Sequence, residues 1–307
     1  FRAIYGALGC ATPSATQAYL AARTRRSART AQLSALSSSF GLGTIVGPAL
    51  APLFVLPWIG LPGPLFAFAL IAIVVTVAIQ LWLPDDRGGR LGGRGAAMSY
   101  PSLASMITGA SVRAATAPQR QKRLSWRDSR IRQWIVAGVI AGHAQAATLT
   151  CIGFFIIDVL RLEPLGAEEP IAIVMMAGAG GTLAAQWGLI PKLGLSPRAL
   201  LMWGSLIAAL GLGITAVADD LYGLVLGFGL ASIGFGFTRP GFTAGASLAV
   251  PLAEQGAVAG LITSANGIAY VAAPAVGMAL YTLDPHLPFA VAVLVVLALA
   301  WWSRSLR

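Results

Sequence analysis

The chain has 307 residues, of which 57% are hydrophobic and 10% are charged, and its net charge is +10. In soluble globular proteins about a quarter of the residues are charged, so this composition excludes an ordinary soluble domain and predicts a membrane protein. The positive charge does not indicate nucleic-acid binding, because the arginines lie in the gaps between apolar runs rather than in one patch.

Nine apolar runs follow one another along the chain, each bounded by proline, glycine or charged residues. A transmembrane helix needs roughly 20 apolar residues to cross the hydrocarbon core. We therefore predict nine transmembrane helices, over residues 1–22, 33–56, 62–83, 132–159, 169–190, 198–217, 221–248, 256–281 and 287–303. Residues 1–83 then hold three helices of an N-terminal bundle, residues 84–131 form a cytoplasmic loop, and residues 132–307 form a C-terminal six-helix bundle.

Basic residues predict the orientation of these helices. If the connections alternate between the two sides, eighteen of the 21 Lys and Arg residues fall on one side and only Arg161 falls on the other. Positively charged loops stay in the cytoplasm, so the first predicted helix runs inward and the C-terminal residue Arg307 lies in the cytoplasm. The long loop ends in a run of basic residues beside the next helix, and we expect this run to contact anionic membrane lipids.

The second predicted helix contains Gly43 and Gly47, followed directly by Pro48. Glycines four positions apart give a helix a flat face that a neighbouring helix can approach closely. Pro48 removes one backbone donor and bends the helix just beyond that face. We expect this segment to pack the two halves of the protein together and to contact substrate little.

The chain also resembles itself. Pro13 precedes Pro48 by 35 positions, Pro240 precedes Pro274 by 34, and a glycine lies four positions before the first proline of each pair. The five residues that begin one position before each second proline match as GPALA and APAVG. The first two predicted helices and the seventh and eighth are therefore interpreted as parallel copies, as in transporters built from two repeats.

These features together resemble the major facilitator superfamily, whose transporters consist of two six-helix halves joined by a long cytoplasmic loop. The order GxxxGP resembles the fifth-helix motif of its drug–proton antiporters, and Arg2 with Gly6 and Gly9 resembles its fourth-helix motif. The resemblance implies an all-α membrane protein with the major facilitator fold, here helices four to twelve with the first three helices absent. It also implies a monomer in a bacterial inner membrane that works by alternating access.

Two arginines, Arg2 and Arg239, lie inside predicted helices. A guanidinium in the membrane costs about 2.5 kcal/mol or more unless it finds water or a partner, so each needs a reason. Arg239 lies next to Pro240, and two roles are open for it. It could supply the counter-charge for a substrate or for a carboxylate that carries protons, or it could bind the backbone carbonyls of a broken helix. The resemblance gives Arg2 a role in proton coupling, with an interfacial anchor as the alternative.

Other polar side chains lie in the C-terminal helices. His143 could relay a proton, because histidine titrates near neutral pH, or it could be a hydrogen-bonded packing residue. Thr263, Asn266 and Tyr270 fall at i, i+3 and i+7, which places them on one helix face. That face either lines the cavity or bonds to a neighbouring helix.

Three further residues are weaker cavity candidates, namely Gln145 and the pair Gln186 and Trp187. The sequence contains no phosphate-binding loop, metal-ligand spacing or nucleophile–base arrangement, so we expect no enzyme, no cofactor and no metal. Our first functional expectation is a secondary transporter that exports small amphipathic or drug-like molecules with protons as the coupling partner. The alternatives are proton-coupled uptake or exchange of an organic anion, and a membrane fragment or sensor that does not transport.

Overall fold

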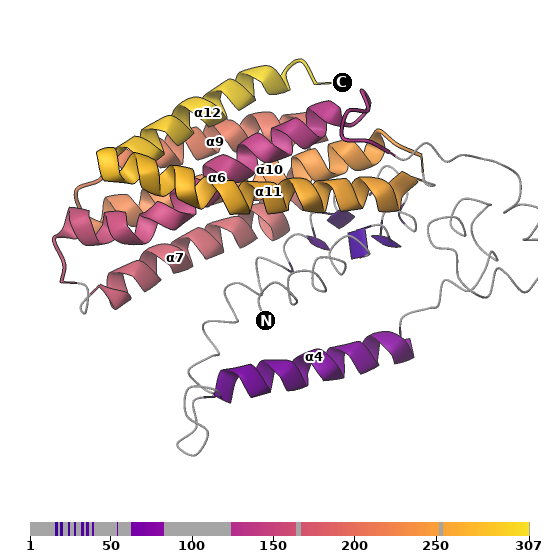
Figure 1. The fold of residues 1–307 in the computed structure, drawn as a ribbon, viewed down its shortest axis with the longest axis horizontal. Coiled ribbons are helices and arrows are strands. Elements are labelled where there is room, and N and C mark those ends of the chain that lie inside the picture. Colours follow the sequence, from indigo (N-terminus) through magenta and orange to yellow (C-terminus); the bar gives the residue numbers. More distant parts are fainter. Residues whose placement is uncertain are drawn as a thin grey trace, which may run out of the picture. The chain divides into compact units, whose positions relative to one another are not determined.

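The structure, a computed structural model, describes residues 63–82, 124–163, 167–251 and 254–306, together with isolated positions between 16 and 54. All the regular elements in these four ranges are helices (Figure 1). They are α4 (Gly63–Trp82), α6 (Arg132–Leu160), α7 (Glu168–Leu183), the π-helical turn η6 (Ala184–Leu189), α8 (Ile190–Leu193), α9 (Pro197–Val217), α10 (Leu221–Leu248), α11 (Gln255–Leu283) and α12 (Leu287–Ser303).

Six helices in the described part of the chain are long and apolar enough to cross a membrane, when α7, η6 and α8 are counted as one span. The shorter apolar helix α12 follows them. Each of the seven helices predicted within the described ranges is present, with boundaries that agree to within three residues. The fold is therefore helical and membrane-spanning, as expected from the apolar runs.

Several predictions fall outside the described residues. These are most of the helices expected at 1–22 and 33–56, the central loop up to residue 123, and the motif residues Arg2, Gly6, Gly9, Pro13, Gly43, Gly47 and Pro48. The count of nine helices, the absence of the first three helices and the boundaries of the two bundles therefore stay predictions.

The chain divides into two compact units, one formed by residues 1–39 with 118–307 and the other by residues 40–117. The second unit contains α4, whose 20 residues include no charged side chain. Within that unit Phe68 packs edge-on against Phe54, with ring centroids 6.0 Å apart. The first unit contains α6 to α12, which lie side by side as a helical bundle (Figure 1).

Glycines let α9 and α10 approach closely. A Cβ atom at Gly204 would lie 2.7 Å from the carbonyl oxygen of Gly234, and one at Gly227 would lie 2.6 Å from the backbone nitrogen of Thr215. Lipid tails are as apolar as leucine, so helices in a membrane associate through such close packing rather than through the hydrophobic effect. The α9–α10 pair is therefore closely packed.

Small residues also join α6 and α11. Ala269 and Ala273 are buried, and a Cβ atom at Gly142 of α6 would lie 2.9 Å from the Cβ of Ala269. One turn beyond Pro274, a Cβ at Gly277 would lie 3.1 Å from the carbonyl oxygen of Ala147. The small side chain of Ala269 therefore permits close contact between α11 and α6.

Polar contacts hold both ends of the α6–α11 pair. At the end where both helices begin, Arg130 forms ion pairs with Glu254 at 2.9 Å and with Asp128 at 2.8 Å. The hydrogen bonds that Arg130 donates to the Asp128 carboxylate, together with the charge of Glu254, raise the pKa of Arg130, so its guanidinium stays protonated. At the other end, the Tyr281 hydroxyl donates a hydrogen bond to a carboxylate oxygen of Asp158.

Candidate functional site

A small cavity lies between α6, α10 and α11. Its volume is about 10 Å³, which is room for about one water molecule. The lining residues are Ala141, Gly142 and Gln145 of α6, Thr238, Arg239 and Phe242 of α10, and Asn266 and Tyr270 of α11. Each helix contributes positions separated by three or four residues, and such positions share one helix face.

On the α6 side, the cavity is lined by small residues and one amide. Ala141 and Gly142 are the small residues, and Gln145 lies about one turn further along the same face. Phe242 contributes an apolar wall from α10, one turn after Arg239. The site therefore combines one charged group, several amide and hydroxyl groups, and an aromatic surface.

Arg239 is the ionised group of this cavity. It lies nine residues before α10 ends at Leu248, which places it about 14 Å from that end of the helix. Arg239 is partly exposed, and Tyr270 of α11, which lines the same cavity, is 47% exposed. None of the residues that line the cavity is Asp, Glu or His, so its net charge is positive.

Thr238 contributes less to the chemistry of the cavity than its position suggests. Its hydroxyl donates a hydrogen bond of 3.0 Å to the carbonyl oxygen of Phe235, within the same helix. The phenol of Tyr270 and the side-chain amides of Gln145 and Asn266 are therefore the neutral groups best suited to contact a ligand. Amides and hydroxyls both donate hydrogen bonds, which suits a ligand that carries oxygen atoms.

The structure brings together four of the residues proposed from the sequence. Gln145 comes from α6, Arg239 from α10, and Asn266 and Tyr270 from α11, and all four line the same cavity. Their functional roles stay predictions.

Two other proposed residues lie away from this cavity. The Thr263 hydroxyl donates a hydrogen bond of 3.0 Å to the carbonyl oxygen of Ala259, so it satisfies its own helix. His143 lies two positions before Gln145, about 200° around the helix, and its Nδ1 lies 2.9 Å from the carbonyl oxygen of Val139. Arg2, the remaining proposed pathway residue, is outside the described residues.

The structure places the two weaker candidates Gln186 and Trp187 in different surroundings. Gln186 is 3% exposed and is buried against α10, whereas Trp187 is 55% exposed. Neither residue lines the cavity. Sequence reasoning also passed over Ala141, Gly142 and Phe242, although a spacing of three or four positions from Gln145 and Arg239 would have indicated them.

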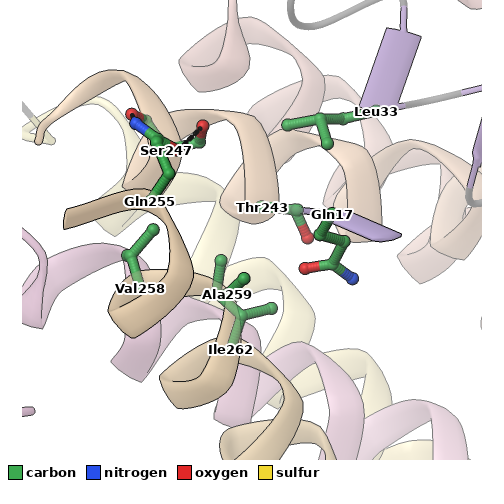
Figure 2. A pocket seen from close by; sticks show the side chains of 8 residues that line it. All are labelled: Gln17, Leu33, Thr243, Ser247, Gln255, Val258, Ala259 and Ile262. Carbon is green, nitrogen blue, oxygen red and sulfur yellow. Dashed lines mark hydrogen bonds between the residues drawn. The ribbon is translucent and has the colours of Figure 1, made fainter. Parts of the chain in front are cut away.

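A second small cavity lies near the turn between α10 and α11 (Figure 2). It is lined by Gln17, Leu33, Thr243, Ser247, Gln255, Val258, Ala259 and Ile262. Gln255 is 2% exposed; it accepts a hydrogen bond of 2.7 Å from the Ser247 hydroxyl and donates one of 2.8 Å to the Ser247 carbonyl (Figure 2). These bonds close the turn, so we interpret Gln255 as a structural residue that the sequence did not indicate.

Comparisons with known proteins agree with this architecture. A profile of the Major Facilitator Superfamily matches residues 1–274 of the chain. A comparison with curated protein sequences finds no match.

Several solved structures share the fold. The human organic anion transporter MFSD10 (TETRAN) is similar with a TM-score of 0.70 and 19% identity, over 94% of this chain and 67% of that chain. The transporter FucP in its outward conformation is similar with a TM-score of 0.64 and 16% identity, over 95% of this chain and 72% of that chain. A variant of the E. coli fucose:proton symporter FucP is similar with a TM-score of 0.61 and 17% identity, over 95% of this chain and 73% of that chain.

Proposed function

Because the chain belongs to the major facilitator superfamily, we propose that it is a secondary transporter whose cavity between α6, α10 and α11 binds the anionic group of a small organic molecule. Members of this family are membrane transporters of small molecules and not enzymes, and the apolar helices described above agree with an integral membrane protein. The proposal therefore concerns the kind of substrate and the residues that bind it.

The position of Arg239 carries this proposal. A guanidinium inside a membrane span costs about 2.5–3.5 kcal/mol on insertion scales, and such residues mark substrate or ion pathways. Arg239 faces a cavity whose lining has no carboxylate, so the field there attracts anions and repels cations. A planar guanidinium also matches a carboxylate in geometry, because two of its N–H groups can bond to the two oxygens.

The remaining lining groups suit an organic acid. Tyr270, Asn266 and Gln145 can donate hydrogen bonds to the oxygens of the anion, and Phe242 can contact its apolar part. Binding of the anion would neutralise the charge of Arg239 and so favour the closing of the cavity around it. Differential binding of this kind is how a ligand biases one access state over another.

A similar solved structure, described as an organic anion transporter, supports the same substrate class. The order of our two transport expectations therefore changes, and exchange or proton-coupled uptake of an organic anion comes first. Alternating access would proceed by rocking of two helical bundles around the site, with the substrate held near the middle of the membrane. We expect a monomer with its C-terminal end in the cytoplasm of a bacterial cell.

Export of drug-like molecules in exchange for protons is the second candidate. It rests on the motif Gly43–Pro48, which lies outside the described residues. This function needs a group that gains and loses a proton during the cycle, and Arg2 and His143 remain the residues proposed for that coupling. The charge of the cavity separates the two candidates, because a lipophilic cation should avoid a site built around Arg239.

Transport by the whole native protein in liposomes tests the proposal. Benzoate serves as the anionic probe and tetraphenylphosphonium as the cationic probe, each radiolabelled and measured with and without an imposed pH gradient. We expect saturable benzoate transport that falls at least about tenfold in Arg239→Gln, because a hydrogen-bonded charge pair is worth about 1.5–3 kcal/mol, and that partly survives in Arg239→Lys.

Two outcomes would contradict this reading. Saturable exchange of tetraphenylphosphonium for protons, with no transport of benzoate, would favour the drug–proton antiporter. Equal benzoate transport by the native protein and the Arg239→Gln variant would remove Arg239 from the substrate site.

A further inference from the structure

Pro240 leaves one carbonyl of α10 without its helical donor. In an α-helix each N–H donates to the carbonyl four positions earlier, and proline has no N–H. The carbonyl oxygen of Gly236 is therefore the group that Pro240 cannot satisfy, and Gly236 is buried. An unpaired carbonyl in the membrane interior costs several kcal/mol, so it needs a donor from elsewhere.

Gln186 supplies that donor. Its Nε2 donates a long hydrogen bond, 3.4 Å, to the carbonyl oxygen of Gly236, fifty positions further along the chain. The side chain is 3% exposed, so water does not compete for the carbonyl. The bond joins the π-helical turn η6 to α10 at the position of the proline break.

Close packing of two helices brings these groups together. A Cβ atom at Gly236 would lie 2.9 Å from the Cβ of Ala185, and one at Gly181 would lie 2.5 Å from the carbonyl oxygen of Gly229. Any larger residue at Gly236 would push α7 and η6 away from α10. The sequence therefore keeps a glycine at the position whose carbonyl Gln186 must reach.

The wide turn η6 also has a local cause. Pro191 cannot donate to the carbonyl of Trp187, four positions earlier, and its ring crowds that carbonyl. The helix widens to a π-turn over Ala184–Leu189, just before this proline, and Gln186 lies within it. Such π-turns are rare and are often found at functional sites.

We propose that Gln186 is a positioning residue for Arg239: by holding the carbonyl that Pro240 leaves open, it fixes the backbone of α10 next to Arg239, which lines the cavity. This proposal rests on the proposed function of Arg239 as the anion-binding group. Gly236, which bonds to Gln186 of η6, lies three positions before Arg239. Phe242, which lines the cavity, lies three positions after it. Arg239 therefore lies on α10 between the side that contacts η6 and the side that lines the cavity.

The main test measures the orientation of position 239 without using any substrate. Arg239→Cys is introduced into the whole protein together with Cys10→Ser and Cys151→Ala, and its rate of labelling by a charged methanethiosulfonate reagent is followed in liposomes. Gln186→Met keeps the length of the side chain and loses the donor, and we expect it to change the labelling rate by about tenfold or more, the effect of losing one buried hydrogen bond. Thr182→Val is the matched control. The Thr182 hydroxyl also donates a hydrogen bond to α10, 3.3 Å long, but its acceptor is the carbonyl of Ser232. That carbonyl keeps its helical donor, the N–H of Gly236, so losing the Thr182 bond should matter little.

Pro240→Ala shows whether the carbonyl is the link. This change restores the missing N–H, so the effect of Gln186→Met on labelling should shrink to about twofold or less in that background. An effect of the same size in both backgrounds, or no effect of Gln186→Met in the native background, would overturn the proposal. If Gln186→Met fails to fold alone, folding in the Pro240→Ala background supports the proposal and failure in both backgrounds contradicts it.

Benzoate transport provides the second readout. In the protein that retains Arg239, Gln186→Met should raise the KM for benzoate by about tenfold and change kcat less, because a displaced guanidinium weakens binding first. A changed labelling rate in a protein that transports no benzoate would contradict only the proposed function. An unchanged labelling rate would contradict only the positioning role.

Discussion

Polar side chains on one face of α11 differ in whether they bond to their own helix. Thr263 and Asn266 lie on the same face of α11, yet the Thr263 hydroxyl bonds to the carbonyl of Ala259, whereas Asn266 lines the cavity. A hydroxyl that bonds back to its own helix has little to offer a ligand. At the scale of the residue, hydrogen-bond partners therefore separate side chains that helical spacing groups together.

These two residues give a matched pair of variants. We expect Asn266→Leu to raise the KM for benzoate at least about tenfold, because a hydrogen bond to a charged group is worth about 1.5–3 kcal/mol. Thr263→Val, which keeps nearly the same volume, should change it by less than about twofold, the error of independent sites. The measurement is the initial rate of benzoate uptake against concentration, and a larger effect from Thr263→Val than from Asn266→Leu would contradict the assignment.

At the scale of the element, glycine has two different uses within α9. A Cβ atom at Gly211 would overlap the backbone nitrogen of Ala231 in α10, whereas a Cβ at Gly213 would meet no atom within 4 Å. The first glycine permits close helix packing and the second does not. Composition alone cannot distinguish them, because both lie in the same apolar run.

Alanine at each position should therefore have opposite effects on stability. Gly211→Ala should destabilise the bundle by about 1–3 kcal/mol or more, because overpacking forces the helices apart. Gly213→Ala should be neutral or stabilising by up to about 1 kcal/mol, because alanine favours the helix. Thermal unfolding of the purified protein in detergent, followed by tryptophan fluorescence, measures both, and equal loss of stability would count against the packing of α9 on α10.

At the scale of the whole molecule, the described bundle carries most of its basic residues at one end. Arg130, Arg132 and Lys192 lie where α6 begins and α8 ends, whereas Asp158 and Asp284 lie where α6 and α11 end. The ion pair of Arg130 with Glu254 joins two elements at the basic end. This arrangement agrees with the orientation expected from basic loops, in which the basic end faces the cytoplasm.

Fusion proteins test that orientation. Green fluorescent protein joined after Arg307 should fluoresce in a bacterial host, because it folds in the cytoplasm. Alkaline phosphatase joined at the same place should be inactive, because it needs the oxidising periplasm for its disulfides. An active phosphatase with no fluorescence would reverse the predicted topology.

The sequence by itself determined the helices and their class. The seven predicted helices in the described ranges agree with the structure to within three residues, because apolar runs long enough to span a membrane are a local property of the chain. The same holds for the shared face of Asn266 and Tyr270, which follows from helical spacing alone. The resemblance to the major facilitator superfamily also came from the sequence, because the spacing of its motifs and the charge of its loops can be read from the order of residues.

Only the tertiary structure decided which helices meet. Gln145, Arg239 and Asn266 are brought to one cavity by the packing of α6, α10 and α11, and Gln186 reaches Gly236 across fifty positions. No local pattern marks these encounters, because they depend on how closely glycines let particular helices approach. Gln186 was only a weak cavity candidate from the sequence. The packing of η6 on α10 instead brings its amide to the Gly236 carbonyl that Pro240 leaves without a donor.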